Sequence, residues 1–137
     1  MIAVDTSAIV AIALGEPERR VFRRIIRHQD KALISTVSVV EARIVLHSRR
    51  GPRAIALFDG LLRLPMFEIV PPGRAEMEAA YAAFVSYGRG SGHPANLNFG
   101  DLFVYALAKV REVPLLFKGD DFVHTDIQPA SAAFEPG

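Results

Sequence analysis

Four acidic residues lie beside apolar segments, where a freely solvated charge is not expected: Asp5, Glu41, Asp101 and Asp120. Asp5 follows the apolar run 2–4, and Asp120 follows the apolar run 114–117. Glu41 has apolar neighbours on both sides, and Asp101 begins a strongly apolar stretch. A carboxylate in such surroundings is costly unless a cation or hydrogen bonds compensate it. These residues are therefore the first candidates for a functional site.

Each of these acids also has an ordinary structural explanation. Aspartate is common at helix N-termini, where it accepts hydrogen bonds from free N–H groups, so Asp5 and Asp101 could be helix caps. The charge of Glu41 could be neutralised by a nearby arginine, with Arg43 and Arg74 as candidates. Taken one at a time, the residues leave both explanations open.

Short apolar strands alternate with amphipathic helices along the chain. The patterns predict strands at 2–4, 32–34, 67–70 and 114–117 and helices at 8–14, 16–30, 37–47, 54–62, 75–87 and 101–110. Three β-branched residues make a strand a rival interpretation near 37–40. The segment 89–99 is predicted to be a long loop, and the tail from Pro129 a weak edge element or a loosely ordered segment.

Two helices carry apolar residues at helical spacing. The predicted buried stripe of the helix at 16–30 is Val21, Phe22, Ile25 and Ile26. The helix at 75–87 presents one apolar face made of Met77, Ala80, Tyr81 and Phe84.

This alternation indicates an α/β fold, a three-layer sandwich in which a mainly parallel sheet is covered by helices on both faces. Ligands of such sheets bind beyond the carboxyl ends of the strands. Asp5 and Asp120 both follow predicted strands, so they can lie at the same edge of the sheet although they are far apart in the chain.

Composition narrows the class of protein further. A chain of 137 residues that is 50% hydrophobic has the size and core of a single domain, spanning 1–137. It has no cysteine, which excludes disulfides, thiolate zinc sites and cysteine nucleophiles. The N-terminus lacks the basic start of a signal peptide, and no apolar run approaches the roughly 20 residues of a membrane span. We therefore expect a cytoplasmic protein that does not enter membranes.

The formal net charge is only +1, so any affinity for nucleic acid must come from local patches. The densest patch is Arg19, Arg20, Arg23, Arg24, Arg27 and His28, and a second patch is Arg49, Arg50 and Arg53. Residues that recur every four positions share a helix face and repel one another if they carry like charges. A solvated helix face explains such a run as readily as binding to RNA phosphates or to an acidic segment of a partner.

Read together, the acidic motifs resemble the PIN-domain family. The matching segments span almost the whole chain: Val4-Asp5-Thr6-Ser7, Ser38-Val39-Val40-Glu41, Asn98-Phe99-Gly100-Asp101 and Leu116-Phe117-Lys118-Gly119-Asp120-Asp121-Phe122. The last two segments, with the loop that precedes Leu97, are similar to VapC-type toxins of toxin–antitoxin systems. The resemblance implies a PIN-like fold and an endoribonuclease that hydrolyses RNA phosphodiester bonds.

The resemblance also implies how the site would work. Asp5, Glu41, Asp101 and Asp120 would be both catalytic residues and ligands of one or two Mg²⁺ or Mn²⁺ ions, which prefer oxygen ligands. Thr6, Ser7 and Asn98 would orient these ligands. The family's fourth acid is variable, and the adjacent Asp121 is the alternative to Asp120. The implied partners are an RNA substrate, an inhibiting VapB-type antitoxin and a second copy in a homodimer.

Other functions fit the sequence less well. The histidines are scattered without the spacing of metal ligands, and there is no Gly-x-Ser-x-Gly elbow of a serine hydrolase. A phosphoacceptor signalling domain would need an acceptor aspartate after the third strand, where Pro71 and Pro72 stand. A PIN fold that only binds RNA or protein is the remaining alternative, although such a fold has no reason to retain buried carboxylates.

Overall fold

A parallel four-stranded sheet forms the centre of the computed structural model, which describes residues 1–130. The strands are β1 (Ile2–Val4), β2 (Ala32–Ser35), β3 (Phe67–Val70) and β4 (Leu115–Leu116), in the order β3-β2-β1-β4. Ala3 of β1 is the partner of Leu33 on one side and of Leu115 on the other. All residues of β1, β2 and β4 are buried, as expected for strands covered on both faces.

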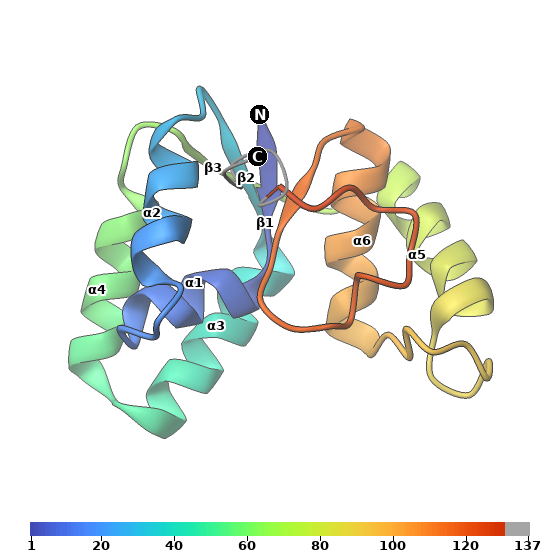
Figure 1. Cartoon of the computed structure of the whole chain (residues 1–137), viewed down its shortest axis with the longest axis horizontal. Helices are drawn as coiled ribbons and strands as arrows, with labels where there is room; N and C mark the ends of the chain where they lie inside the picture. The colour runs from blue at the N-terminus through green and yellow to red at the C-terminus, as the bar shows by residue number, and fades with distance from the viewer. Residues whose placement is uncertain (131–137) are drawn as a thin grey trace.

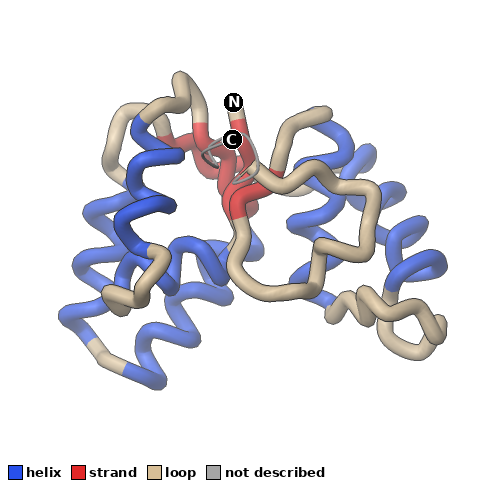
Figure 2. Tube along the Cα trace, viewed as in Figure 1, coloured by secondary structure: helices blue, strands red, loops and turns tan. Residues whose placement is uncertain are grey.

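Helices cover the two faces of the sheet, as the layers of Figure 1 and the central strands of Figure 2 show. The helices of one face are α1 (Thr6–Ala13), α2 (Arg19–Arg27), α3 (Thr36–Arg49) and α4 (Pro52–Leu62). The other face is covered by α5 (Arg74–Tyr87) and α6 (Phe99–Arg111). Successive residues of β1 enter different cores, with Ile2 and Val4 in the first and Ala3 in the second. The expected three-layer α/β sandwich is confirmed.

The segment 37–40 is helical, so the rival interpretation as a strand is wrong. Ser35 ends β2 and caps α3, because its hydroxyl accepts a hydrogen bond from the Val37 amide at 3.2 Å. This cap directs the chain into a helix despite its β-branched residues. Glu41 consequently lies on α3.

Two expectations about buried faces need correction. Val21 is half exposed, whereas its predicted companions on α2 are buried. On α5 the three large residues of the predicted apolar face, Met77, Tyr81 and Phe84, are exposed, whereas Ala80 of the same face and Ala83 are buried. Helical periodicity identifies an apolar face, but the small side chains are what allow α5 to pack closely against α6.

The segment after β4 crosses back over α6. The Tyr105 hydroxyl and the Lys109 ammonium group, both on α6, bind the two carboxylate oxygens of Asp126, each at 2.6 Å. Pro129 then forms an isolated bridge to Leu115, in line with the predicted weak edge element, and the rest of the predicted tail lies outside the described residues. Among residues 1–130, no helix has the length and apolar character needed to cross a membrane.

Candidate active site

Asp5 lies at the carboxyl end of β1 and is 6% exposed. It is the N-cap of α1, and its Oδ2 atom accepts hydrogen bonds from the Ser7 amide at 3.0 Å and the Ser7 hydroxyl at 2.5 Å. Burial raises the pKa of Asp5 to about 6, although the Ser7 hydrogen bonds lower it, and the nearby charge of Glu41 adds to the rise. The carboxylate is thus held in place but poorly compensated.

Ser7 connects this carboxylate to the other end of the chain. Its hydroxyl oxygen accepts a hydrogen bond from the Lys118 amide at 2.9 Å while its proton is donated to Asp5. Lys118 follows β4, the strand that neighbours β1. One hydroxyl group therefore fixes the segment after β4 relative to Asp5.

Glu41 comes from α3 and meets the first turn of α1. The Thr6 hydroxyl donates a hydrogen bond to Glu41 Oε1 at 2.6 Å. Neither arginine considered as its partner takes that role: Arg43 pairs with Asp59 at 3.2 Å, and no ion pair joins Arg74 to Glu41 within residues 1–130. Glu41 is therefore compensated by a hydroxyl group and not by a cation of the described chain.

Gly100, in the first turn of α6, borders the same carboxylate. A Cβ atom at this position would overlap the Glu41 carboxylate, with Cδ only 3.1 Å away. The absence of a side chain at Gly100 lets Glu41 lie against α6. In the sequence, Gly100 stands out only as one member of the Asn98-to-Asp101 motif. Its contact with Glu41 cannot be predicted there, because it depends on how closely α3 and α6 approach each other.

Asp101 is both a capping residue and a member of the acidic cluster. Its amide donates to Asn98 Oδ1 at 2.9 Å, and its Oδ2 atom accepts from the Asn98 amide at 3.1 Å, forming a reciprocal capping box. The pKa of Asp101 is raised to about 7, mainly by burial and in addition by the charges of Asp5, Asp121 and Glu41, against the lowering effect of the Asn98 amide. The capping explanation and the cluster explanation are therefore compatible.

The two candidates for the fourth acid behave differently. Asp120 and Asp121 are both exposed and follow Gly119, which has a φ of +103°. Asp121 is among the largest contributions that raise the pKa of Asp101, and Asp120 is not among them. The electrostatics of the cluster thus involve Asp121, the alternative to the predicted Asp120.

Carboxylates that follow β1, lie on α3 and α6 and follow β4 act on one another electrostatically at the carboxyl edge of the sheet. Within residues 1–130, no cationic side chain forms an ion pair with Asp5, Glu41 or Asp101. The same part of the chain contains no group of three acidic or histidine side chains arranged to hold a metal ion. The donors are all oxygen atoms, which suits Mg²⁺ or Mn²⁺ better than zinc.

Comparison with known sequences finds one family over nearly the whole chain. Residues 2–128 match the model of the PIN domain. Ribonuclease VapC42 of Mycobacterium tuberculosis is 43% identical over 127 residues, which cover 93% of this chain and 97% of that protein. Ribonuclease VapC28 of the same organism is also 43% identical over 127 residues, covering 93% and 96% of the two chains.

Solved structures share the fold at lower identity. The Mycobacterium tuberculosis toxin VapC20, described as cleaving the sarcin-ricin loop, superposes with a TM-score of 0.74 at 18% identity, covering 94% of this chain and all of that one. FitAcB from Neisseria gonorrhoeae gives a TM-score of 0.66 at 22% identity, with 94% and 96% coverage. A toxin–antitoxin complex from Klebsiella pneumoniae gives a TM-score of 0.66 at 16% identity, with 89% and 90% coverage.

Proposed function

The chain belongs to the PIN-domain family, and from this premise we propose that it is a metal-dependent endoribonuclease, the toxin of a toxin–antitoxin pair. The proposal depends above all on one observation: the charges of Asp5, Glu41 and Asp121 act on Asp101, and no ion pair of the described chain neutralises any of them. A group of like charges that is partly removed from water is unfavourable unless a cation joins it. The ribonuclease relatives, at 43% identity, supply the substrate class.

Asp5 and Asp101 are the main metal ligands in this proposal, and Glu41 with Asp120 or Asp121 completes the set. A bound Mg²⁺ or Mn²⁺ ion would supply a water of lowered pKa and would stabilise the charge that develops on the leaving oxygen. Ser7 and Asn98 hold the two main ligands through the hydrogen bonds described above, and Thr6 holds Glu41. No histidine is required as a base.

The test is cleavage of RNA by the purified protein with Mn²⁺, with EDTA and after Asp5→Asn. We expect cleavage only by the wild type with metal. Asp59→Asn is the matched control, because Asp59 is an acid outside the cluster that pairs with Arg43. Cleavage that survives both EDTA and Asp5→Asn would contradict the proposal. RNA binding without cleavage under any condition would favour the alternative, a PIN fold that only binds.

The antitoxin is proposed to occupy an apolar groove between α2 and α4. This groove of about 390 Å³ is lined by apolar residues, Ile26 and Leu61 among them, and by Arg19, Arg23 and Arg27. An acidic amphipathic segment, of the kind that an antitoxin could provide, is complementary to both features. Leu57→Glu on the groove wall should abolish co-purification with a co-expressed antitoxin and leave RNA cleavage intact. Retained co-purification would place the antitoxin elsewhere.

The exposed apolar face of α5 supports the proposed homodimer. Met77, Tyr81, Phe84 and Val85 are between 46% and 68% exposed and share this helix. An apolar patch of this kind commonly marks an interface between proteins. Tyr81→Glu should convert a dimer into a monomer in sedimentation, and a monomeric wild type would refute this part of the proposal.

A further inference from the structure

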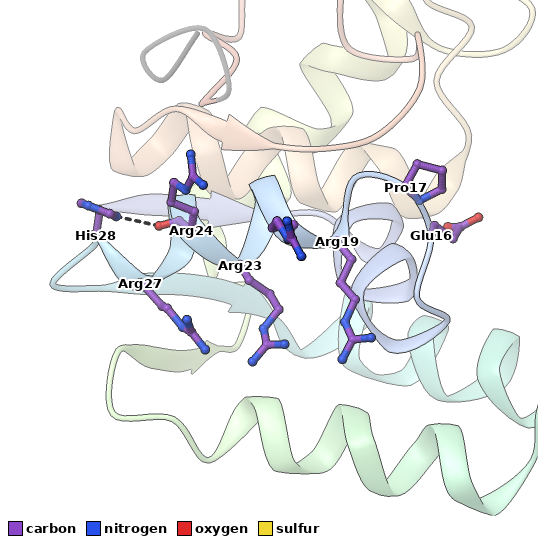
Figure 3. Close-up of a pocket in the computed structure, with 8 residues that line it drawn as sticks. Glu16, Pro17, Arg19, Arg23, Arg24, Arg27 and His28 are labelled. Carbon is purple, nitrogen blue, oxygen red and sulfur yellow. Dashed lines mark hydrogen bonds between the residues drawn. The ribbon is translucent and has the colours of Figure 1, made fainter. Parts of the chain in front are cut away.

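The surface of α2 is the most strongly charged region that the proposed catalysis does not use. Its side chains line an open hollow of about 690 Å³ (Figure 3). The lining consists of Glu16, Pro17, Arg19, Arg20, Arg23, Arg24, Arg27 and His28. Arginines at positions four apart lie on successive turns of the helix, so their charges are close neighbours.

The arginines of this hollow are not neutralised by the nearby acids. Glu16 and Glu18 both pair with Lys118, each at 3.2 Å. Asp30 pairs with the N-terminal ammonium group at 3.4 Å. Within residues 1–130, no ion pair involves an arginine of α2. Like charges at this spacing destabilise a helix, and a bound anion would offset that cost.

The hollow and the apolar groove are different surfaces of the same helix. Arg19, Arg23 and Arg27 line both of them, whereas Arg20 and Arg24 line only the hollow. In Figure 3 the side chain of Arg24 extends to one side of α2, and those of Arg19, Arg23 and Arg27 extend to the other. Substitutions at Arg20 and Arg24 therefore test the hollow without changing the groove.

A chain of contacts joins the hollow to the carboxylate cluster. Glu16, at the edge of the hollow, pairs with the ammonium group of Lys118. The Lys118 amide donates to the Ser7 hydroxyl, which in turn donates to Asp5. The row of arginines thus starts near the edge of the sheet that carries the candidate active site. It continues along α2 away from that edge.

We propose that Arg20 and Arg24, together with the other arginines of α2, bind the phosphates of single-stranded RNA that flanks the bond to be cut. The inference rests on the proposed ribonuclease function and adds the surface that holds the substrate. Arginine binds phosphate oxygens through paired N–H donors. Apart from Pro17, the residues that line the hollow are charged side chains and His28, which favours a phosphate backbone over an amphipathic peptide.

The experiment compares Arg20→Gln/Arg24→Gln with Arg63→Gln/Arg111→Gln, a control that removes the same charge from exposed positions at the ends of α4 and α6, outside the hollow and outside both basic patches. Binding of a fluorescent single-stranded RNA of mixed sequence is measured in EDTA by anisotropy over a range of salt concentrations. We expect the first variant to weaken binding on the order of tenfold at low salt and to reduce the salt slope by about 1.4, since each lost phosphate contact on a single strand contributes about 0.7. The control should bind like the wild type.

Cleavage of the same RNA with Mn²⁺ is measured in parallel, so that the two proposals can fail separately. A wild type that cleaves, combined with equal RNA binding by the two variants, overturns the inference about α2. A wild type that does not cleave with metal contradicts the ribonuclease proposal instead. A polyglutamate peptide is the competing probe: if the α2 variant loses affinity for polyglutamate but not for RNA, the hollow binds an acidic protein and the inference is wrong.

Discussion

The carboxylate of Glu41 lies against Gly100, in the space that the Cβ atom of any other residue would occupy. We predict that Gly100→Ala moves Glu41 and lowers RNA cleavage on the order of 100-fold, since a shift of about 1 Å can cost this much. Gly60→Ala on α4 is the matched control, because a Cβ atom there meets no neighbour within 4 Å. Rates for both variants at saturating Mn²⁺ are the measurement. Equal rates would mean that Glu41 has freedom to adjust.

Ser7→Ala removes the hydroxyl group that connects Asp5 with the Lys118 amide. An unpaired buried amide costs about 1–3 kcal/mol, so we expect a loss of stability of that order in urea unfolding, together with slower cleavage. The pKa of Asp5 should rise further, because the Ser7 hydrogen bonds lower it. Ser48→Ala, which removes an exposed hydroxyl bonded to the Ile44 carbonyl at 3.0 Å, should change neither property. Similar effects from both substitutions would exclude a special role for Ser7.

Much of the arrangement follows from local patterns in the sequence. Short apolar strands that alternate with helices predict a parallel sheet, and the carboxyl edge of such a sheet brings Asp5 near the segment after β4. The Ser7 hydroxyl that joins this segment to Asp5 agrees with that reasoning. The parallel sheet and the proximity of Asp5 to the segment after β4 depend on the order and direction of the strands. The alternation of apolar strands and helices in the sequence can indicate both.

Other features depend on distances between elements, which periodicity does not contain. The clearance between Glu41 and Gly100 exists only because α3 and α6 approach closely. The outward apolar face of α5 follows from the close packing of Ala80 and Ala83, so the larger Tyr81 is left exposed. Sequence patterns can identify such residues as candidates, but they do not show which residues these candidates contact.

The choice between Asp120 and Asp121 also cannot be read from periodicity, because it depends on the backbone conformation at Gly119. Gly119 has a φ of +103°, a backbone conformation that residues with a side chain rarely adopt. Since the charge of Asp121 raises the pKa of Asp101, we expect Asp121→Asn to slow cleavage more than Asp120→Asn. The measurement is the rate of RNA cleavage by each variant at the same Mn²⁺ concentration. A larger effect of Asp120→Asn would support Asp120, the residue predicted from the sequence, as the fourth acid.

The pH dependence of stability without metal gives a direct test of the cluster. Folding raises the pKa of Asp5 to about 6 and that of Asp101 to about 7, from an ordinary value of 3.8 for each. The folded protein therefore binds more protons than the unfolded chain between these values, and its stability falls as the pH rises from about 4 to about 7. In EDTA we expect the melting temperature to drop by several degrees over this range. A melting temperature that rises instead would contradict the raised pKa values.

Asp101→Asn separates the electrostatic role of this residue from its role as a cap. The variant keeps the shape of the side chain but removes its charge, so in EDTA at pH 8 we expect a higher melting temperature than that of the wild type and a weaker dependence on pH. It should also lose most of the stabilisation by Mn²⁺, which for the wild type amounts to about 2.7 kcal/mol when the metal is at 100 times its dissociation constant.

Asn98→Ala is the matched control for this last comparison, because it removes the side chain that caps α6 and leaves the Asp101 charge in place. Loss of a cap costs about 1 kcal/mol at every pH and does not neutralise a metal ligand, so this variant should be less stable than the wild type and still respond to Mn²⁺. Melting curves of both variants with EDTA and with Mn²⁺ distinguish the roles. If Asp101→Asn behaves like Asn98→Ala, Asp101 acts as a cap alone, and the proposed metal site loses one of its two main ligands.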